Sequence, residues 1–266
     1  MDLGLKGKTA LVTGSYRGTG AAIAHVLAEE GAIALVHGNE VGQPDEVVDS
    51  ITSAGGDARP IVGDLLTDSG VDAMFDSNAD ALAAIDVLVN NLGRPEGSRW
   101  SSMDRWAQAW NTNIMSGVRL TQRALVPMRQ RKWGRVVFLG TVGSRMPGRR
   151  NPAYYTAKSG LHGLVRSLAQ ELSGSGITAN VVSPGMIATA EVKDMVRRQA
   201  ERAGFDHLDD WPALQGWAVE STMANLTGRI AEPVDIARAV AFVCSEAAWH
   251  VNGSDVAVDG GAVDAR

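Results

Sequence analysis

The chain contains one cysteine, no long apolar run and no excess of basic residues, and each shortage excludes a class of protein. Its single cysteine, Cys244, cannot form a disulfide within the chain. Cys244 lies in the apolar run 241–244, which favours a core residue over a catalytic thiol. Lysine and arginine total 25 against 30 aspartates and glutamates, so no general basic field is available for nucleic acid or an anionic membrane. We expect a small-molecule substrate instead.

Targeting and metal-binding signals are also missing from the sequence. No apolar run reaches the roughly 18 residues that a membrane span needs, and the first residues lack a basic segment followed by an apolar one. We therefore expect a cytoplasmic protein with no membrane partner. No catalytic metal is predicted, because no ligand spacing connects the carboxylates or Cys244 with the histidines His25, His162, His207 and His250.

Short apolar runs alternate with longer helix-like stretches along most of the 266 residues. The runs suit buried parallel strands and occupy 9–13, 33–36, 60–62, 87–89, 136–139, 179–182 and 256–258. This alternation predicts an α/β fold: one domain over 1–266, built on a Rossmann-type, doubly wound parallel sheet of about seven strands with helices on both faces. Ligands of such a sheet bind outside the carboxyl ends of its strands.

One long segment, 188–225, does not follow the strand–helix alternation and is interpreted as an insertion that forms a lid over the active site. It contains the aromatic residues Phe205, Trp211 and Trp217. These side chains either line a site for a bulky apolar ketone or anchor the lid to the body of the protein. The sequence leaves both alternatives open.

A glycine-rich turn follows the first predicted strand and precedes an apolar helix that starts at Ala21. Its glycines allow a close approach to the backbone, and the helix N-terminus directs N–H groups at an anion. The turn is therefore predicted to bind the pyrophosphate of a dinucleotide through Gly14, Ser15, Arg17, Gly18, Thr19 and Gly20.

The second predicted strand ends at His37, Gly38 and Asn39, without the carboxylate that usually binds the ribose of NAD. Arg17 can instead receive a 2′-phosphate, assisted by His37 or Asn39. NADP(H) is therefore favoured over NAD(H) as the cofactor. In the alternative interpretation Arg17 is a solvated cation and Glu40 binds the ribose.

Tyr154 and Lys158 lie four residues apart in a stretch, 154–173, whose leucines recur at helical spacing. Side chains four apart share one helix face, so the Lys158 ammonium is expected to lower the pKa of the Tyr154 phenol toward neutrality. A phenol of that kind exchanges protons with a carbonyl group.

In their order along the chain, these motifs closely resemble those of the short-chain dehydrogenase/reductase family, from Lys8 to Gly261. The glycine turn at 13–20 and the YxxxK pair Tyr154 and Lys158 carry the resemblance, with Leu92 replacing the alanine usual in the stretch 90–93. The further matching residues are Asp64, Asn91, Gly93, Asn113, Pro184, Gly185, Ile187, Thr189, Gly260 and Gly261.

The resemblance implies hydride transfer between a nicotinamide and a ketone or secondary alcohol (EC 1.1.1.-). Tyr154 would act as acid or base and Lys158 would also hold the nicotinamide ribose. Asn113 would support a water near Lys158, although bonding to a helix carbonyl is its alternative role. Beyond the glycine turn the expected cofactor contacts are His37, Gly38, Asn39, Asp64, Leu65, Asn91, Gly93, Tyr154, Lys158, Pro184, Gly185, Ile187 and Thr189.

The family's catalytic serine is replaced in this sequence by Thr141. Threonine keeps the hydroxyl but adds a methyl group and a stiffer side chain, so it either polarises the substrate oxygen or misplaces the hydroxyl. Ser144 is the other hydroxyl available, although its place in the following loop favours a turn residue. We predict that Thr141 takes the catalytic role.

Three functions remain open at this point. The leading one is an NADP(H)-dependent carbonyl reductase or alcohol dehydrogenase, and the second is a 3-oxoacyl-thioester reductase that acts on acyl carrier protein. The third is a catalytically weak regulatory protein that binds the cofactor. Nucleic-acid binding through the glycine turn would need a basic stripe that the chain lacks. The resemblance also implies a homotetramer or a homodimer.

Overall fold

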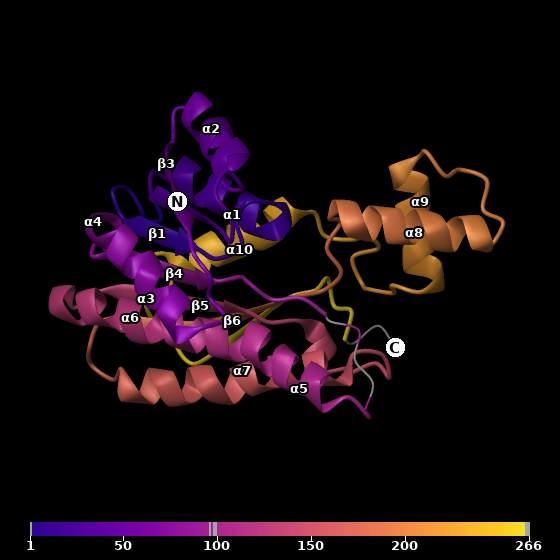
Figure 1. The fold of residues 1–266 in the computed structure, drawn as a ribbon. Helices are drawn as coiled ribbons and strands as arrows, with labels where there is room; N and C mark the ends of the chain where they lie inside the picture. The colour runs from indigo at the N-terminus through magenta and orange to yellow at the C-terminus, as the bar shows by residue number, and fades with distance from the viewer. Residues whose placement is uncertain (1, 96, 98–99, 264–266) are drawn as a thin grey trace.

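The computed structural model describes residues 2–95, 97 and 100–263, and its centre is one sheet of seven parallel strands (Figure 1). The strand order β3-β2-β1-β4-β5-β6-β7 runs outward in both directions from β1, as in a doubly wound sheet. The strands are β1 (Thr9–Val12), β2 (Ile33–Gly38), β3 (Asp57–Val62), β4 (Ile85–Asn90), β5 (Gly134–Leu139), β6 (Ile177–Pro184) and β7 (Asp255–Val258). The predicted fold class is confirmed, and each of the seven apolar runs contributes to one of these strands.

The central strands are apolar on both faces because helices cover the sheet from both sides. Every residue of β1, β4, β5 and β6 is buried, whereas the edge strands β3 and β7 are partly exposed. The helices α1 (Gly18–Glu29), α2 (Asp45–Ser53) and α10 (Pro233–Cys244) pack on one face. The other face carries α3 (Asp68–Ser77), α4 (Ala79–Leu82), α6 (Ser116–Arg131) and α7 (Pro152–Glu171), and α5 (Met103–Trp110) lies against α7.

Two irregular turns interrupt the regular elements near the carboxyl ends of the strands. The π-helical turn η1 (Asn111–Met115) joins α5 to α6, and the short 3₁₀ turn η2 (Val142–Ser144) follows β5. A π turn adds one residue to the helical repeat and occurs frequently at functional sites. Both turns carry or adjoin predicted catalytic residues, because Asn113 lies within η1 and Thr141 precedes η2.

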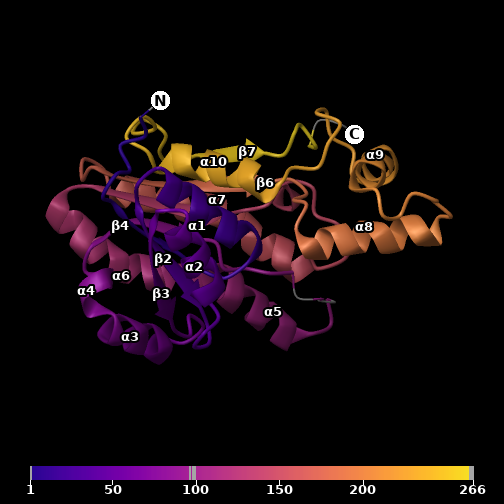
Figure 2. The same cartoon turned by 90° about the horizontal axis from the view of Figure 1, so that it is seen from above.

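The segment between β6 and α10 forms α8 (Ala190–Arg202) and α9 (Trp211–Ser221), which extend beyond the carboxyl ends of the strands (Figures 1 and 2). These two helices share a small apolar cluster of their own. The rings of Phe205 and Trp217 are 6.1 Å apart, and Trp211 Nε1 donates to Glu232 Oε1 at 3.3 Å. The aromatic residues therefore hold the two helices together and attach them to the start of α10, which favours the anchoring alternative.

The prediction of one domain over 1–266 includes residues 1, 96, 98–99 and 264–266, which lie outside the described residues. Within the described ranges, no helix is both long enough and apolar enough to span a membrane. Cys244 is fully buried at the end of α10, where burial raises the pKa of its thiol to about 12. The interpretation of Cys244 as a core residue is confirmed.

Candidate active site

The glycine turn borders a groove of about 250 Å³ at the carboxyl ends of β1 and β4, which we call the glycine-turn groove. Gly14 and Gly18 adopt φ values of +59° and +58°, which favour glycine. A Cβ on Gly20 would lie 2.6 Å from both Gly14 O and Asn91 Nδ2, so only glycine lets α1 begin this close to the loop after β4. The N-terminus of α1 at this groove fits a dinucleotide pyrophosphate.

The loop after β4 supports the glycine turn through hydrogen bonds. Asn91 Nδ2 donates to Thr13 O at 2.8 Å, and the Leu92 amide donates to Thr13 Oγ1 at the same distance. The turn and the loop therefore form one rigid wall of the groove.

Most of the predicted contacts from these loops line the glycine-turn groove. They are Gly14, Arg17, Gly18, Thr19, Gly20, Asn39, Asn91 and Gly93. Reasoning from sequence missed the further lining residues Tyr16, Leu66, Leu92, Arg94, Thr112 and Glu191. All but Thr112 and Glu191 adjoin predicted contacts, so their neighbours could have indicated them. Glu191 belongs to α8 and gave no such signal.

His37 is buried below the groove, which corrects the prediction that it assists a 2′-phosphate. Its Nδ1 accepts from the Gly14 amide at 3.1 Å, and its Nε2 lies 3.0 Å from Gly63 O. Since an amide only donates and a carbonyl only accepts, His37 is neutral with its proton on Nε2. Burial lowers its pKa to about 4, although the bond to Gly63 opposes this shift. The ring therefore joins two loops instead of facing an anion.

Ser15 and Leu65, also predicted as contacts, are fully buried as well. The Ser15 hydroxyl donates to Val12 O at 2.7 Å and accepts from the His37 amide at 2.9 Å. Leu65 packs into the core, and its neighbour Leu66 lines the groove. Both residues support the groove from below.

The neutrality of His37 makes the stability of the protein depend on pH. The unfolded chain has the ordinary histidine pKa of 6.5 and the folded chain a value of about 4. Between these two pKa values the unfolded state binds a proton at His37 and the folded state does not. The contribution of neutral His37 to the free energy of unfolding is therefore full above pH 6.5 and is lost as the pH falls toward 4. We expect the free energy of unfolding to fall by about 2 kcal/mol from pH 7 to pH 5 because of His37.

Urea denaturation at both pH values tests this expectation through the change with pH rather than through absolute stability. In His37→Asn the fall in the free energy of unfolding from pH 7 to pH 5 should be smaller than in the wild type by about 2 kcal/mol. In the control His250→Asn, at an exposed histidine, that fall should be the same as in the wild type. Equal changes in the wild type and in His37→Asn would contradict the assignment.

Arg17 lines the groove and extends toward α8. Its Nη1 lies 3.2 Å from Glu191 Oε1, and both side chains are more than half exposed. Directly after β2, the backbone N–H of Asn39 donates to Gln43 Oε1 at 2.8 Å. Asn39 lines the groove, whereas Glu40 is not one of the described residues that do so.

Tyr154 lies in the first turns of α7, and its environment corrects the expectation of a lowered pKa. Burial raises the pKa of Tyr154 to about 12, Tyr155 adds to the rise, and a hydrogen bond with the Thr141 side chain opposes it. Lys158, whose Nζ donates to Leu139 O at 2.7 Å, does not offset the effect of burial on Tyr154. Tyr154 is therefore a neutral phenol at physiological pH.

Lys158 and Asn113 meet at Gly93. A Cβ on Gly93 would lie 2.7 Å from both Lys158 Nζ and Asn113 Oδ1. Lys158 is fully buried, which lowers its pKa to about 8. Asn113 Nδ2 donates to the helix carbonyl of Ala109 at 2.9 Å, and its Oδ1 accepts from the Arg94 amide at 3.1 Å. The helix-carbonyl bond considered for Asn113 is therefore present.

The two candidate hydroxyls after β5 point to different partners. Thr141 Oγ1 accepts from the Gly143 amide at 3.1 Å and lies close enough to Tyr154 to oppose the rise in the pKa of its phenol that burial causes. Ser144 Oγ donates to Thr141 O at 2.7 Å and lies 3.5 Å from His162 Nε2. Thr141 is thus the hydroxyl beside Tyr154, and Ser144 is a turn residue.

The predicted residues at the end of β6 and after it lead into α8. The Gly185 amide donates to Val258 O at 3.1 Å, Ile187 pairs with Ala231, and Thr189 caps the N-terminus of α8. Pro184 ends β6 before them. This segment therefore connects the carboxyl end of β6 to α8, beside the neighbouring strand β5, which Thr141 follows.

A second cavity, of about 500 Å³, lies between this segment, the region after α9 and the loop after β7, and we call it the lid-side pocket. Val142 and Met186, the neighbours of Thr141 and Gly185, form part of its lining. Met146 and Met223 add apolar surface, and the polar lining includes Asn225, Thr227, Arg229 and Asp259. Among the described residues, no cluster of three or more His, Cys, Asp or Glu side chains could hold a metal ion.

The family model for short chain dehydrogenases matches residues 8–200. The chain is 35% identical to the uncharacterised oxidoreductase YvaG of Bacillus subtilis (strain 168), an alignment that covers 99% of this chain and 98% of the relative. It is 32% identical to the 3-oxoacyl-[acyl-carrier-protein] reductase FabG of Pseudomonas aeruginosa, with 97% and 98% covered.

Among solved structures, the L-sorbose reductase of Gluconobacter frateurii in complex with NADPH and L-sorbose superposes with a TM-score of 0.89. It is 29% identical, and the alignment covers 99% of each chain. Together with the glycine turn and the Tyr154–Lys158 pair, these matches show that the chain belongs to the short-chain dehydrogenase family and is an oxidoreductase that acts on CH–OH or C=O groups.

Proposed function

We propose that the protein is an NADP(H)-dependent oxidoreductase of a ketone and its secondary alcohol, with Tyr154 as the general acid and base. The observation that carries the proposal is the placement of the Tyr154 phenol, whose pKa is raised by burial against the opposing effect of the neighbouring Thr141 side chain, on the same helix as the buried Lys158. This group lies at the carboxyl ends of the strands, where the glycine-turn groove opens. A carbonyl oxygen placed between the two hydroxyls would accept a hydrogen bond from each.

The bound nicotinamide supplies or receives the hydride, and the protein controls the proton. In reduction Tyr154 Oη, neutral because of its raised pKa, donates its proton to the oxygen that becomes the alcohol. The Thr141 hydroxyl orients that oxygen. Lys158 Nζ has three donors, of which Leu139 O uses one, so the others can bind ribose and favour the phenolate that remains on Tyr154.

Arg17 supports the preference for a 2′-phosphate, and its loss gives a test of that preference. We expect Arg17→Ala to raise the Kd of NADPH by roughly 10- to 100-fold, because a hydrogen bond to a charged group contributes about 1.5–3 kcal/mol. The Kd of NADH should change by less than about threefold. Titrations that follow nicotinamide fluorescence measure both constants, and Arg202→Ala, at the end of α8, is the control. Equal losses for the two nucleotides would refute the role of Arg17.

The lid-side pocket is proposed to receive the part of the substrate remote from the carbonyl, covered by the lid at 188–225. Its lining combines methionines with Asn225, Thr227 and Arg229, which suits a substrate with both apolar and hydroxylated parts. A reductase of 3-oxoacyl thioesters is the second candidate, favoured by the similarity to FabG.

Purified protein titrated with NADPH and NADH, and then mixed with a panel of ketones, ketoses and 3-oxoacyl thioesters, tests the proposal. Oxidation of NADPH by a ketone or ketose supports the first candidate, and turnover of the thioesters alone supports the second. Binding without turnover by any of them would favour the catalytically weak protein. If neither nucleotide bound, the proposal as a whole would fail.

We also propose that the protein is a cytoplasmic homotetramer or homodimer. Exposed apolar side chains on α5, η1 and α6 support association: Met103, Trp110, Met115 and Val126. Light scattering at micromolar concentration measures the state, and a persistent monomer would reject this part of the proposal.

A further inference from the structure

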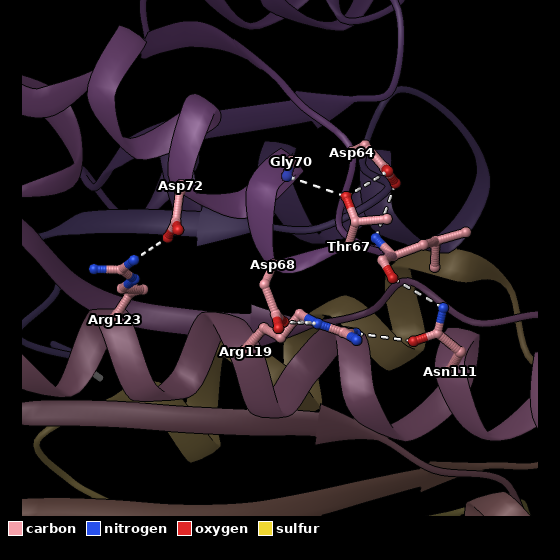
Figure 3. Close-up of polar contacts among 9 residues, drawn as sticks. Asp64, Thr67, Asp68, Gly70, Asp72, Asn111, Arg119 and Arg123 are labelled. Carbon is pink, nitrogen blue, oxygen red and sulfur yellow. Dashed lines mark hydrogen bonds and ion pairs between the residues drawn. The ribbon is translucent and has the colours of Figure 1, made fainter.

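We propose that Asn111 is a positioning residue for the adenosine end of the glycine-turn groove. The inference rests on the proposed dinucleotide cofactor, since Asn111 acts on the loop 64–66 after β3, where the adenine contact Asp64 is expected. Asn111 Nδ2 donates to Leu66 O at 2.9 Å (Figure 3). Leu66 is one of the residues that line the groove. No catalytic or cofactor role was predicted for Asn111 from the sequence.

The polar backbone groups of Leu66 are held from two directions. Its amide donates to Asp64 Oδ1 at 2.9 Å, while its carbonyl accepts from Asn111. Asp64 Oδ2 also accepts from the Thr67 hydroxyl at 3.0 Å, and Thr67 Oγ1 caps α3 by accepting from the Gly70 amide (Figure 3). The loop at the groove is thus fixed by α3 on one side and by Asn111 on the other.

Arg119 fixes the orientation of the Asn111 amide. Arg119 Nη1 donates to Asn111 Oδ1 at 2.9 Å, and its Nε donates to Asp68 Oδ1 at 2.5 Å. Because arginine only donates and the Leu66 carbonyl only accepts, the amide has one favourable orientation. Arg119 is mostly buried, with 18% of its side chain exposed, so its hold on Asn111 is shielded from water.

A neighbouring ion pair also links α3 to α6, and it serves as a control that distinguishes positioning of the Leu66 loop from simple cross-linking of the two helices. Arg123 on α6 binds Asp72 on α3, one turn further along the same two helices (Figure 3). Among the described residues, the hydrogen bond and the ion pair of the Arg123 side chain both go to Asp72 and neither goes to the loop at 64–66. Loss of Arg123 therefore removes a bond between α3 and α6 while leaving Leu66 in place.

Asn111→Asp tests the proposal with a side chain of nearly the same size. The variant keeps an oxygen for Arg119 but replaces the donor to Leu66 O with an acceptor, which repels that carbonyl. We expect the Kd of NADPH and that of 2′,5′-ADP, which lacks the nicotinamide half, to rise by the same factor of about 10. The kcat at saturating NADPH should stay within about twofold, since the bonds that hold Asn113 do not involve Asn111.

Calorimetric titration of each variant gives the binding constants, and steady-state rates separate KM from kcat. The control Arg123→Gln should bind both ligands as the wild type does. Arg119→Gln leaves the Asn111 side chain in place but removes the bond that orients it, and it should raise the Kd of NADPH and that of 2′,5′-ADP by about threefold. This variant tests the proposal if Asn111→Asp does not fold.

Wild-type affinity of Asn111→Asp for 2′,5′-ADP, or a lower kcat at unchanged Kd, would overturn the proposal. If Arg123→Gln weakened binding as much as Asn111→Asp, the role would be structural and the proposal would also fall. A wild-type protein that bound neither NADPH nor NADH would instead refute the proposed function.

Discussion

Replacing Tyr154 by phenylalanine is expected to lower kcat by about 10³-fold while the Kd of NADPH stays within about threefold. The variant keeps the ring, which packs edge-on against Tyr155 at 5.4 Å, and removes only the hydroxyl. The Thr141 hydroxyl stays in place, held by the Gly143 amide, but the group that exchanges the proton is gone. Steady-state rates with the best substrate of the panel, and a nucleotide titration, measure the two effects.

The direction of the pKa shift adds a pH dependence to this expectation. With a pKa of about 12, Tyr154 remains protonated through neutral pH and is ready to donate in reduction. Oxidation of the alcohol needs the phenolate, so its rate should rise with pH where reduction stays level. Tyr155→Phe, one position along α7, is the matched control and should retain most of the activity. If Tyr154→Phe kept more than about a tenth of the wild-type kcat, the proton would come from another group.

The fold was predictable because its signals are local. Helices cover both faces of the sheet, so the central strands β1, β4, β5 and β6 are buried on both faces. A strand buried in this way is a short apolar run, and such a run can be recognised from the sequence. The glycine turn was predictable for a similar reason, since Gly14 and Gly18 have backbone angles that other residues rarely adopt.

Electrostatic environments were not predictable from spacing. Spacing of four residues on a helix suggested that Lys158 lowers the pKa of Tyr154, but burial dominates and raises it. His37 follows the same rule. Its place at the end of β2 suggested a phosphate contact, whereas complete burial makes it a neutral link between Gly14 and Gly63. Desolvation depends on the whole packed structure, which no local motif contains.

Contacts between distant segments were also beyond the sequence. Glu191 of α8 binds Arg17 in the glycine turn, and Asn111 binds the Leu66 carbonyl although the two residues lie 45 positions apart in the sequence. Neither Glu191 nor Asn111 belongs to a sequence motif whose spacing predicts a contact. These contacts form because the carboxyl ends of parallel strands bring the loops that follow them to one edge of the sheet.

Gly93→Ala is expected to lower kcat/KM by about 10²-fold, because the added methyl group would displace two buried polar groups. Its Cβ would lie 2.7 Å from Lys158 Nζ and from Asn113 Oδ1, and 3.3 Å from Lys158 Cε. Neither neighbour can move freely, since Leu139 O holds Lys158 and Ala109 O holds Asn113. Displacing either one leaves buried hydrogen-bonding groups without partners, which costs about 1–3 kcal/mol for each group.

Gly97→Ala in the same loop is the control, since a Cβ at Gly97 meets no atom within 4 Å among the residues that the structure describes. It should keep wild-type activity and thermal stability. Gly93→Ala should lose both, and Tm measured with and without NADPH should show less stabilisation by the nucleotide than in the wild type. An active and stable Gly93→Ala protein would mean that the loop moves away from Lys158 and Asn113 at little cost. In that case these two side chains would not depend on Gly93 for their positions, and the catalytic arrangement would tolerate a looser wall than the structure indicates.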